Sequence, residues 1–173
     1  GVIFYVLLAL RARLRDEGRV EGRGPDLANL LDLVAVGTVA DLVPLDANNR
    51  ALVAAGLRRL RAGRGCAGLM SLAEVSGRRA EALVAADIGY AIGPRLNAAG
   101  RLEDMSLGIE CLLCDDPAQA RALAQRLDAI NRERRSVQQA MLDEAEQALS
   151  ARALEAFGAP AAAPASVCAF DAD

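Results

Sequence analysis

The sequence predicts a mainly α-helical chain, and three observations support this fold class. The 173 residues are 53% hydrophobic, which suits a packed core rather than a disordered segment. Only 3% are aromatic and tryptophan is absent, so the core must consist of Leu, Val, Ile and Ala, which suit helices. Apolar residues also recur at spacings of three and four along most of the chain.

Two helices are predicted before the middle of the chain is reached. The first covers residues 2–15, with arginines late in it, where cations suit a helix C-terminus. A loop rich in glycine follows over residues 16–25. Asp26 can cap the second helix, whose apolar positions continue to Thr38. A buried strand over residues 33–39 is the alternative, because short apolar runs fit either structure.

A third helix is predicted from Ala47 or Asn48, with an apolar face and an arginine-rich outer face. That outer face is either an ordinary solvated surface or a patch that contacts a phosphate backbone. Its arginines are Arg50, Arg58, Arg59, Arg61 and Arg64.

The middle of the chain is predicted to alternate short helices with turns. Glycine and proline mark the breaks, and apolar spacing marks the helices. The expected segments are a turn at 63–68, a short helix at 68–75, a helix at 78–91, a loop at 93–102 and a short helix at 106–114.

The C-terminal part is predicted to be one long helix and the start of another domain. Asp116 can cap the helix and Pro117 suits an early helical position, and the apolar stripe then continues to about Phe157. A helix of this length usually connects two domains. Residues 158–164 form a Pro/Ala linker, and residues 166–170 are expected to form a strand.

Charge and composition exclude several kinds of site. The net charge is −3, so no overall basic field attracts nucleic acid, and any such binding needs a local patch. Histidine is absent, which excludes histidine catalysis and histidine metal ligands in this chain. Residues 1–10 are apolar but too short to span a bilayer, so no membrane partner is expected.

The four cysteines favour a reducing, cytoplasmic location. Cys111 and Cys114 form a CxxC pair, but it lies in an apolar helical pattern without a second pair. Core thiols therefore explain the cysteines better than a zinc or redox site. The other two cysteines are Cys66 and Cys168.

One carboxylate, Asp41, lies at the end of the apolar run of the second helix. Small residues precede it, and Pro44 stops any helix shortly afterwards. Because its neighbours are apolar, we expect this carboxylate to be buried and to need a cation or strong donors. A metal or catalytic role is one interpretation, and a helix cap or a solvated side chain is the other.

A second stretch, residues 93–102, is suited to anion binding. Arg95 and Arg101 can donate forked hydrogen bonds to phosphate oxygens, and Asn97 can both donate and accept. Alternatively, Arg95 pairs with an acid such as Asp87 or Asp104, and Asn97 caps a turn. The residues alone leave these two interpretations open.

The two stretches together resemble a known family. The sequence is similar to the RecJ-type exonucleases of the DHH phosphoesterase superfamily along nearly its whole length. The matching motifs are LDLVAVGTVADLVPL (31–45), NNR (48–50), GPRLNAAGRL (93–102), DMS (104–106) and LDAINRER (127–134).

The resemblance implies a metal-dependent nuclease that degrades single-stranded DNA from the 5′ end, in DNA repair and recombination. It implies Mn²⁺ or Mg²⁺ as cofactor, with Asp41 as a metal ligand and catalytic residue. It places Asn97 in the catalytic cleft, and Arg95, Asn97 and Arg101 on the substrate phosphates. Single-stranded DNA is the implied partner, and a single-strand-binding protein is a candidate partner.

The family's Asp-His-His signature and its glycine-rich second-domain motif are missing, so the resemblance implies an internal fragment that is inactive alone. The fragment would be the C-terminal part of an α/β DHH domain, a long connecting helix and the first strand of a second α/β domain (DHHA1-like). The expected boundaries are 1–115, 116–158 and 159–173. Helices shaped for a missing upstream part would expose apolar faces, above all residues 2–10, and self-associate.

Two other functions are weighed against this one. Other DHH phosphoesterases cut short oligonucleotides or cyclic dinucleotides, but they generally lack the full GPRLNAAGRL stretch. A non-catalytic helical scaffold would not need Asp41, Arg95, Asn97 and Arg101 together.

Overall fold

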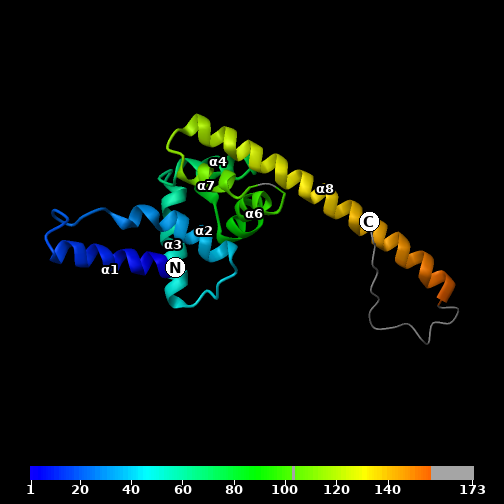
Figure 1. The fold of residues 1–173 in the computed structure, drawn as a ribbon, viewed down its shortest axis with the longest axis horizontal. Coiled ribbons are helices and arrows are strands. Elements are labelled where there is room, and N and C mark those ends of the chain that lie inside the picture. The colour runs from blue at the N-terminus through cyan, green and yellow to red at the C-terminus, as the bar shows by residue number, and fades with distance from the viewer. Residues whose placement is uncertain (103, 157–173) are drawn as a thin grey trace. The chain divides into compact units, whose positions relative to one another are not determined.

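The computed structural model describes residues 1–102 and 104–156, and every regular element within them is helical (Figure 1). The chain divides into two compact units, Gly1–Asn131 and Arg132–Asp173. The predicted linker at 158–164, the strand at 166–170 and Cys168 lie outside the described residues. The predicted domain boundaries stay a prediction.

The first unit begins with the helices that the sequence predicts. Asp26 caps the second of them, because its side chain accepts a hydrogen bond from the Ala28 N–H at 3.1 Å. Asp46 caps the next helix in the same way, accepting from the Asn49 N–H at 2.7 Å. The strand considered for residues 33–39 is wrong, since these residues are α-helical. The elements are α1 (Val2–Asp16), a 3₁₀ turn η1 (Leu27–Leu30), α2 (Leu31–Ala40) and α3 (Ala47–Arg61).

Helix α1 exposes apolar side chains, as the sequence analysis expects for residues 2–10. None of its residues is buried. Val2 is 80% exposed and Ile3 is 70% exposed, and Val6 and Leu10 are also exposed. This part of the expectation is confirmed, whereas self-association stays a prediction.

Helices α2 and α3 lie side by side and in direct backbone contact (Figure 1). The contact forms at Gly56 of α3, where an added Cβ would lie 2.2 Å from the Leu31 carbonyl oxygen and 2.5 Å from the Ala35 Cβ. No side chain larger than a hydrogen atom fits there. The position of α2 therefore depends on glycine at this residue.

The middle of the chain differs from the prediction over residues 78–91. A single helix is wrong there, because the chain forms a 3₁₀ turn η2 (Ala80–Ala82), then extended backbone, and then a new helix α5 (Ala85–Asp87). Asp87 starts that helix by accepting a hydrogen bond from the Val84 N–H at 3.0 Å. The Leu83 carbonyl accepts from Arg61 Nε at 2.7 Å, which holds the extended stretch against α3.

The predicted loop at 93–102 is also wrong. Helix α5 runs without a break into a π-helical turn η3 (Ile88–Ile92) and then into helix α6 (Gly93–Leu102). The Gly93 N–H bonds to the Ile88 carbonyl, five residues back. Pro94 lacks an N–H and cannot continue a regular hydrogen-bond ladder. The wider π turn directly before it lets the helix pass this point.

The remaining helices follow the prediction closely. The short predicted helices at 68–75 and 106–114 and the long one from 117 are confirmed within one or two residues. They are α4 (Ala67–Val75), α7 (Ser106–Leu113) and α8 (Pro117–Ala156).

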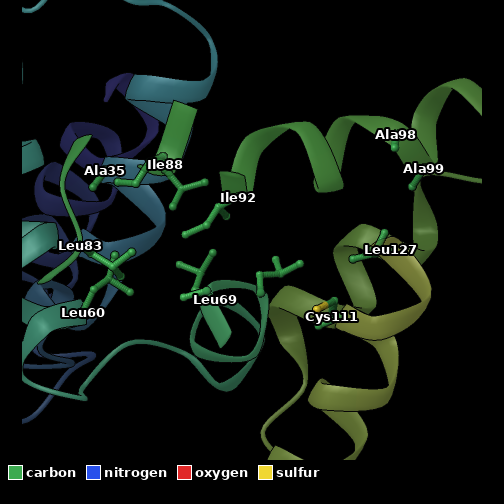
Figure 2. Close-up of a cluster of buried hydrophobic side chains, with 14 of the residues drawn as sticks. Ala35, Leu60, Leu69, Leu83, Ile88, Ile92, Ala98, Ala99, Cys111 and Leu127 are labelled. Carbon is green, nitrogen blue, oxygen red and sulfur yellow. The ribbon is translucent and has the colours of Figure 1, made fainter. Parts of the chain in front are cut away.

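One apolar core joins these helices in the first unit. Figure 2 shows Leu60, Leu69, Leu83, Ile88 and Ile92 directed toward one another. All five side chains are fully buried, and they come from several segments of the chain. Leu, Ile and Ala dominate this core, as the poverty in aromatic residues predicts.

The thiols belong to this helical body. Cys111 is fully buried, whereas Cys66 and Cys114 are half-buried. Burial raises the pKa of Cys111 to about 11. An added Cβ on Gly68 would lie 1.9 Å from the Cys111 carbonyl oxygen, so α4 and α7 are in close contact here.

The second unit is described for residues 132–156, where α8 continues. Val137, Met141 and Leu142 are each at least half exposed on it. In the described ranges, 1–102 and 104–156, no helix combines the length and apolarity needed to cross a membrane.

We predict that Gly56→Ala lowers the free energy of unfolding by about 1–3 kcal/mol, because the added methyl group collides with the α2 backbone. Gly37→Ala is the matched control, since nothing lies within 4 Å of its added Cβ. That change should leave stability unchanged or raise it by up to about 1 kcal/mol. Urea unfolding of both variants measures the difference, and equal effects would contradict the close helix contact.

Candidate metal and phosphate site

Asp41 lies at the C-terminal end of α2, where the sequence places it. It is the C-cap residue, and its N–H donates to the Gly37 carbonyl at 3.3 Å. The Leu42 N–H then bonds to the Val39 carbonyl and the Val43 N–H to the Thr38 carbonyl, both at 3.2 Å. This pair of bonds is the Schellman motif. The motif ends the helix directly at Asp41 and fixes where its side chain leaves the backbone.

The residue after Asp41 is held in an unfavourable conformation. Leu42 has a φ of 53°, the left-handed region that usually requires glycine. Its side chain is 89% exposed, so no packing compensates for the strain. Backbone strain of this kind often occurs at functional sites.

The expectation that the Asp41 carboxylate is buried is wrong. Asp41 is exposed, because a side chain at the end of a helix projects beyond the helix body. The buried carboxylate of α2 is Asp32 instead, which is 1% exposed. It accepts hydrogen bonds from the Leu33 N–H at 2.9 Å and the Cys66 N–H at 2.7 Å. Asp32 therefore holds α4 to α2 as a structural group.

Asp41 and Asn97 line the same cavity. It has a volume of about 510 Å³ and lies between α2, α6 and α7. Its other walls are mostly apolar, including Leu33, Leu96 and Ile109. The structure thus brings together one carboxylate and one amide from stretches more than fifty residues apart.

Glycine again permits the approach that forms this cavity. An added Cβ on Gly93 would lie 3.2 Å from the Ala40 Cβ, so the start of α6 lies against the end of α2. Asn97 is one helical turn further along α6 and is exposed. The glycine that the sequence analysis assigned to a loop is needed for a helix contact.

Arg95 does not face open solvent. Its Nε donates to Asp128 Oδ1 at 2.8 Å, one terminal nitrogen lies 2.8 Å from the same oxygen as an ion pair, and the other terminal nitrogen donates to the Ala91 carbonyl at 2.7 Å. The two side chains are 15% and 10% exposed. Of the two interpretations left open, the structure has the ion pair. The guanidinium is engaged with Asp128 and not directed at a phosphate.

The partner of Arg95 differs from those the sequence suggested. Asp87 pairs with Arg78 at 3.2 Å. Asp104 accepts from the Ser106 N–H at 3.0 Å, which lowers the pKa of its carboxyl. Asp128 was missed, because it lies about 100° round the helix from Leu127 and outside the apolar stripe, so apolar spacing gives no signal of its burial.

Arg101 belongs to α6, and its side chain lies outside the described part of the structure. Within residues 1–102 and 104–156, no group of three or more Asp, Glu, Cys or His side chains converges as a metal site. The described candidate site therefore consists of Asp41 and Asn97, supported by the Arg95–Asp128 pair.

Comparison with known proteins finds relatives named as single-stranded-DNA-specific exonucleases. No protein-family model matches the chain. It is 60% identical over 148 residues to the single-stranded-DNA-specific exonuclease RecJ of Dickeya dadantii, covering 84% of this chain and 26% of that protein. The RecJ of Escherichia coli is 56% identical over 148 residues, which again cover 84% of this chain and 26% of that protein.

Solved structures agree with this match. RecJ of Thermus thermophilus in complex with Mg²⁺ has a TM-score of 0.72 and 40% identity, covering 83% of this chain and 21% of that one. An exonuclease RecJ bound to manganese has the same TM-score and identity, and the match covers 34% of its chain. The resemblance to RecJ-type exonucleases is thus confirmed, and the chain spans about a quarter of the length of the curated relatives it matches.

We predict that Leu42→Gly raises the free energy of unfolding by about 1 kcal/mol, because glycine adopts the left-handed conformation without strain. Leu45→Gly, three residues later, makes the same chemical change where φ is not positive, and it should not stabilise. Thermal unfolding of both variants measures this. Equal shifts would show that Leu42 is not strained.

We predict that Arg95→Met lowers the free energy of unfolding by about 3–5 kcal/mol, because it removes a closely bound cation from the largely buried Asp128. The double variant Arg95→Met/Asp128→Leu should recover most of the loss. The control is Arg121→Met, which breaks a pair of equal length (2.8 Å) to Glu74 that is more than half exposed. That change should cost under about 1 kcal/mol. Chemical unfolding of the three variants measures these differences, and equal losses for Arg95→Met and Arg121→Met would contradict the buried pair.

Proposed function

We propose that this chain is a segment of a metal-dependent exonuclease that hydrolyses phosphodiester bonds in single-stranded DNA from the 5′ end. The observation that carries the proposal is the shared cavity of Asp41 and Asn97, in a chain 60% identical to a protein named for this activity. Work in DNA repair and recombination, in the cytoplasm, follows from the same relationship. A single-strand-binding protein is a candidate partner of the whole enzyme.

The donor set of the cavity suits a hard divalent cation. A carboxylate oxygen and an amide oxygen are ligands that Mg²⁺ and Mn²⁺ accept, and the exposed Asp41 side chain is accessible to an ion. RecJ structures contain Mg²⁺ or Mn²⁺. When bound, such a cation activates water and neutralises charge on the phosphoryl group. Asp41 would be one of its ligands, with further ligands from the rest of the parent protein.

Two other residues of the segment would contact the substrate, and a third would hold the elements of the site in position. Asn97 can donate its amide N–H to a phosphate oxygen while its carbonyl accepts from water. Arg101, on the same helix, is proposed to contact the next phosphate. Arg95 is a positioning residue, since its guanidinium joins the π turn at Ala91 to Asp128 of α8.

The finer domain assignment belongs to the same proposal. Residues 1–115 would be the C-terminal part of a DHH phosphoesterase domain, and 116–158 a connecting helix. Residues 159–173 would be a linker and the first strand of a second domain. The 40-residue length of α8 supports the connecting role.

We test the proposal with a chimera in which this chain replaces the matching segment of the Dickeya dadantii RecJ. The chimera should degrade 5′-labelled single-stranded DNA in Mn²⁺ or Mg²⁺. Asp41→Ala should reduce the rate more than about a hundredfold, because loss of groups behind metal ligands alone costs 10–100-fold. The control is Asp115→Ala, another exposed aspartate that follows a helix end, which should leave the rate unchanged.

The chain by itself should bind Mn²⁺ weakly and leave DNA intact, since two donors do not hold a catalytic ion. A chimera that melts like its RecJ parent but is inactive would contradict the proposal. Hydrolysis by the 173-residue chain that disappears with Asp41→Ala would contradict the fragment interpretation.

A further inference from the structure

A second cavity, with polar walls, lies at the C-terminal end of α3. It has a volume of about 570 Å³, and three arginines from the last turn of α3 and the turn after it line it. They are Arg58, Arg59 and Arg64, and Asp26 and Asn29 also line the cavity. The sequence left the arginines of this helix open between a solvated surface and a phosphate contact.

Arg59 is fixed in place but incompletely bonded. One terminal nitrogen donates to Asn29 Oδ1 at 3.0 Å and the other to the Arg64 carbonyl at 2.8 Å. Its Nε is buried without a hydrogen-bond partner among the described residues. The Nε is enclosed by protein atoms, so a ligand in the cavity would meet the terminal nitrogens of Arg59, each of which carries a second N–H donor.

The other two guanidinium groups are available. Arg58 and Arg64 are exposed, and within the described part of the chain neither guanidinium forms a hydrogen bond or an ion pair. The one acid in the wall, Asp26, already accepts from the Ala28 N–H. Three cations therefore face one anion in a chain whose net charge is −3.

Helix electrostatics explain only part of this cluster. Cations in the last turn of a helix are favourable next to its carbonyl groups, which accounts for Arg58. The same effect accounts for Arg59, whereas Arg64 lies beyond the helix end. The position of Arg64 beside two other cations is explained by a ligand that carries negative charge.

We propose that this arginine pocket binds a phosphate group, either of a single-stranded nucleic-acid backbone or of a free nucleotide. Guanidinium groups match phosphate oxygens in charge and in forked geometry. The 15 residues of α3 span roughly 22 Å at about 1.5 Å per residue, and the helix begins at Ala47, shortly after Asp41. The pocket thus lies at the opposite end of α3 from the candidate catalytic residues. The inference rests on the proposed nucleic-acid substrate.

The test measures binding of a fluorescent oligothymidylate to the 173-residue chain over a range of salt concentrations. For Arg58→Gln/Arg64→Gln, affinity should fall, and the slope of log affinity against log salt should become shallower by about 0.7, the value for one lost phosphate contact on a single strand. The matched control is Arg13→Gln/Arg15→Gln, which removes the same charge from exposed residues in the last turn of α1. It should keep the wild-type slope.

Further experiments separate the effect of positive charge from that of the forked guanidinium geometry. They also distinguish a nucleic-acid strand from a free nucleotide as the ligand. Arg58→Lys/Arg64→Lys keeps the charge but loses the fork, so its affinity should lie between wild type and the glutamine variant. Competition by a deoxynucleoside monophosphate as strong as by the oligomer would assign the pocket to free nucleotides, and length-dependent competition to a strand. If the double variant unfolds at a lower temperature than wild type, Arg64→Gln alone replaces it in the test, because Arg64 lies in the turn after the helix.

Two outcomes overturn the inference. One is a glutamine variant that binds like the Arg13/Arg15 control with the same slope. The other is a wild-type chain that binds no oligomer or nucleotide at low salt. Neither touches the proposed nuclease function, which the activity of the chimera decides separately.

Discussion

The close contact between α2 and α3 at Gly56 is the constraint on which the candidate site depends. With the Gly56 backbone against Leu31 and Ala35, the axis of α2 is fixed relative to α3. Gly93 then brings the start of α6 against Ala40, one residue before Asp41. The contact at Gly56 requires a residue without a Cβ, and at Gly93 an added Cβ would force Ala40 to shift, so the walls of the cavity are set largely by backbone approach.

Buried charges fix the same framework where apolar packing alone would leave freedom. Asp32 satisfies its carboxylate with two backbone N–H groups, one of them at the start of α4. Arg95 links the π turn to Asp128 with two hydrogen bonds and an ion pair. Such groups add little net stability compared with apolar residues of the same size, because both charges lose their hydration. These groups fix how the helices are oriented, since a small rotation of α6 would break hydrogen bonds that the core cannot replace.

The sequence predicts those parts of the fold that depend on local chemistry. Helical spacing found α1, α2, α3 and the long α8, and the cap at Asp26 follows from side-chain chemistry alone. The placement of Asp41 at a helix end is of this local kind. These features need no knowledge of distant residues.

The errors concern features that distant residues decide. Gly93 and Pro94 indicate a loop by propensity, yet the chain passes them as a helix because a π turn absorbs the missing N–H and the core retains Ile88 and Ile92. The partner of Arg95 lies 33 residues away on α8, and no local rule selects Asp128 over the nearer aspartates. The burial of Asp32 and not Asp41 depends on which side of α2 meets α3 and α4.

The exposure of Asp41 bears on how such a site can exist in a separate segment. A buried carboxylate without its cation would destabilise the fold, whereas an exposed one keeps its hydration until a cation and further ligands arrive. The two hydrogen bonds of the Schellman motif fix the end of the helix without requiring an ion, in spite of the strain at Leu42. Under the proposed function, the carboxylate of Asp41 would therefore be open to a cation without a cost to the stability of the segment before the cation binds.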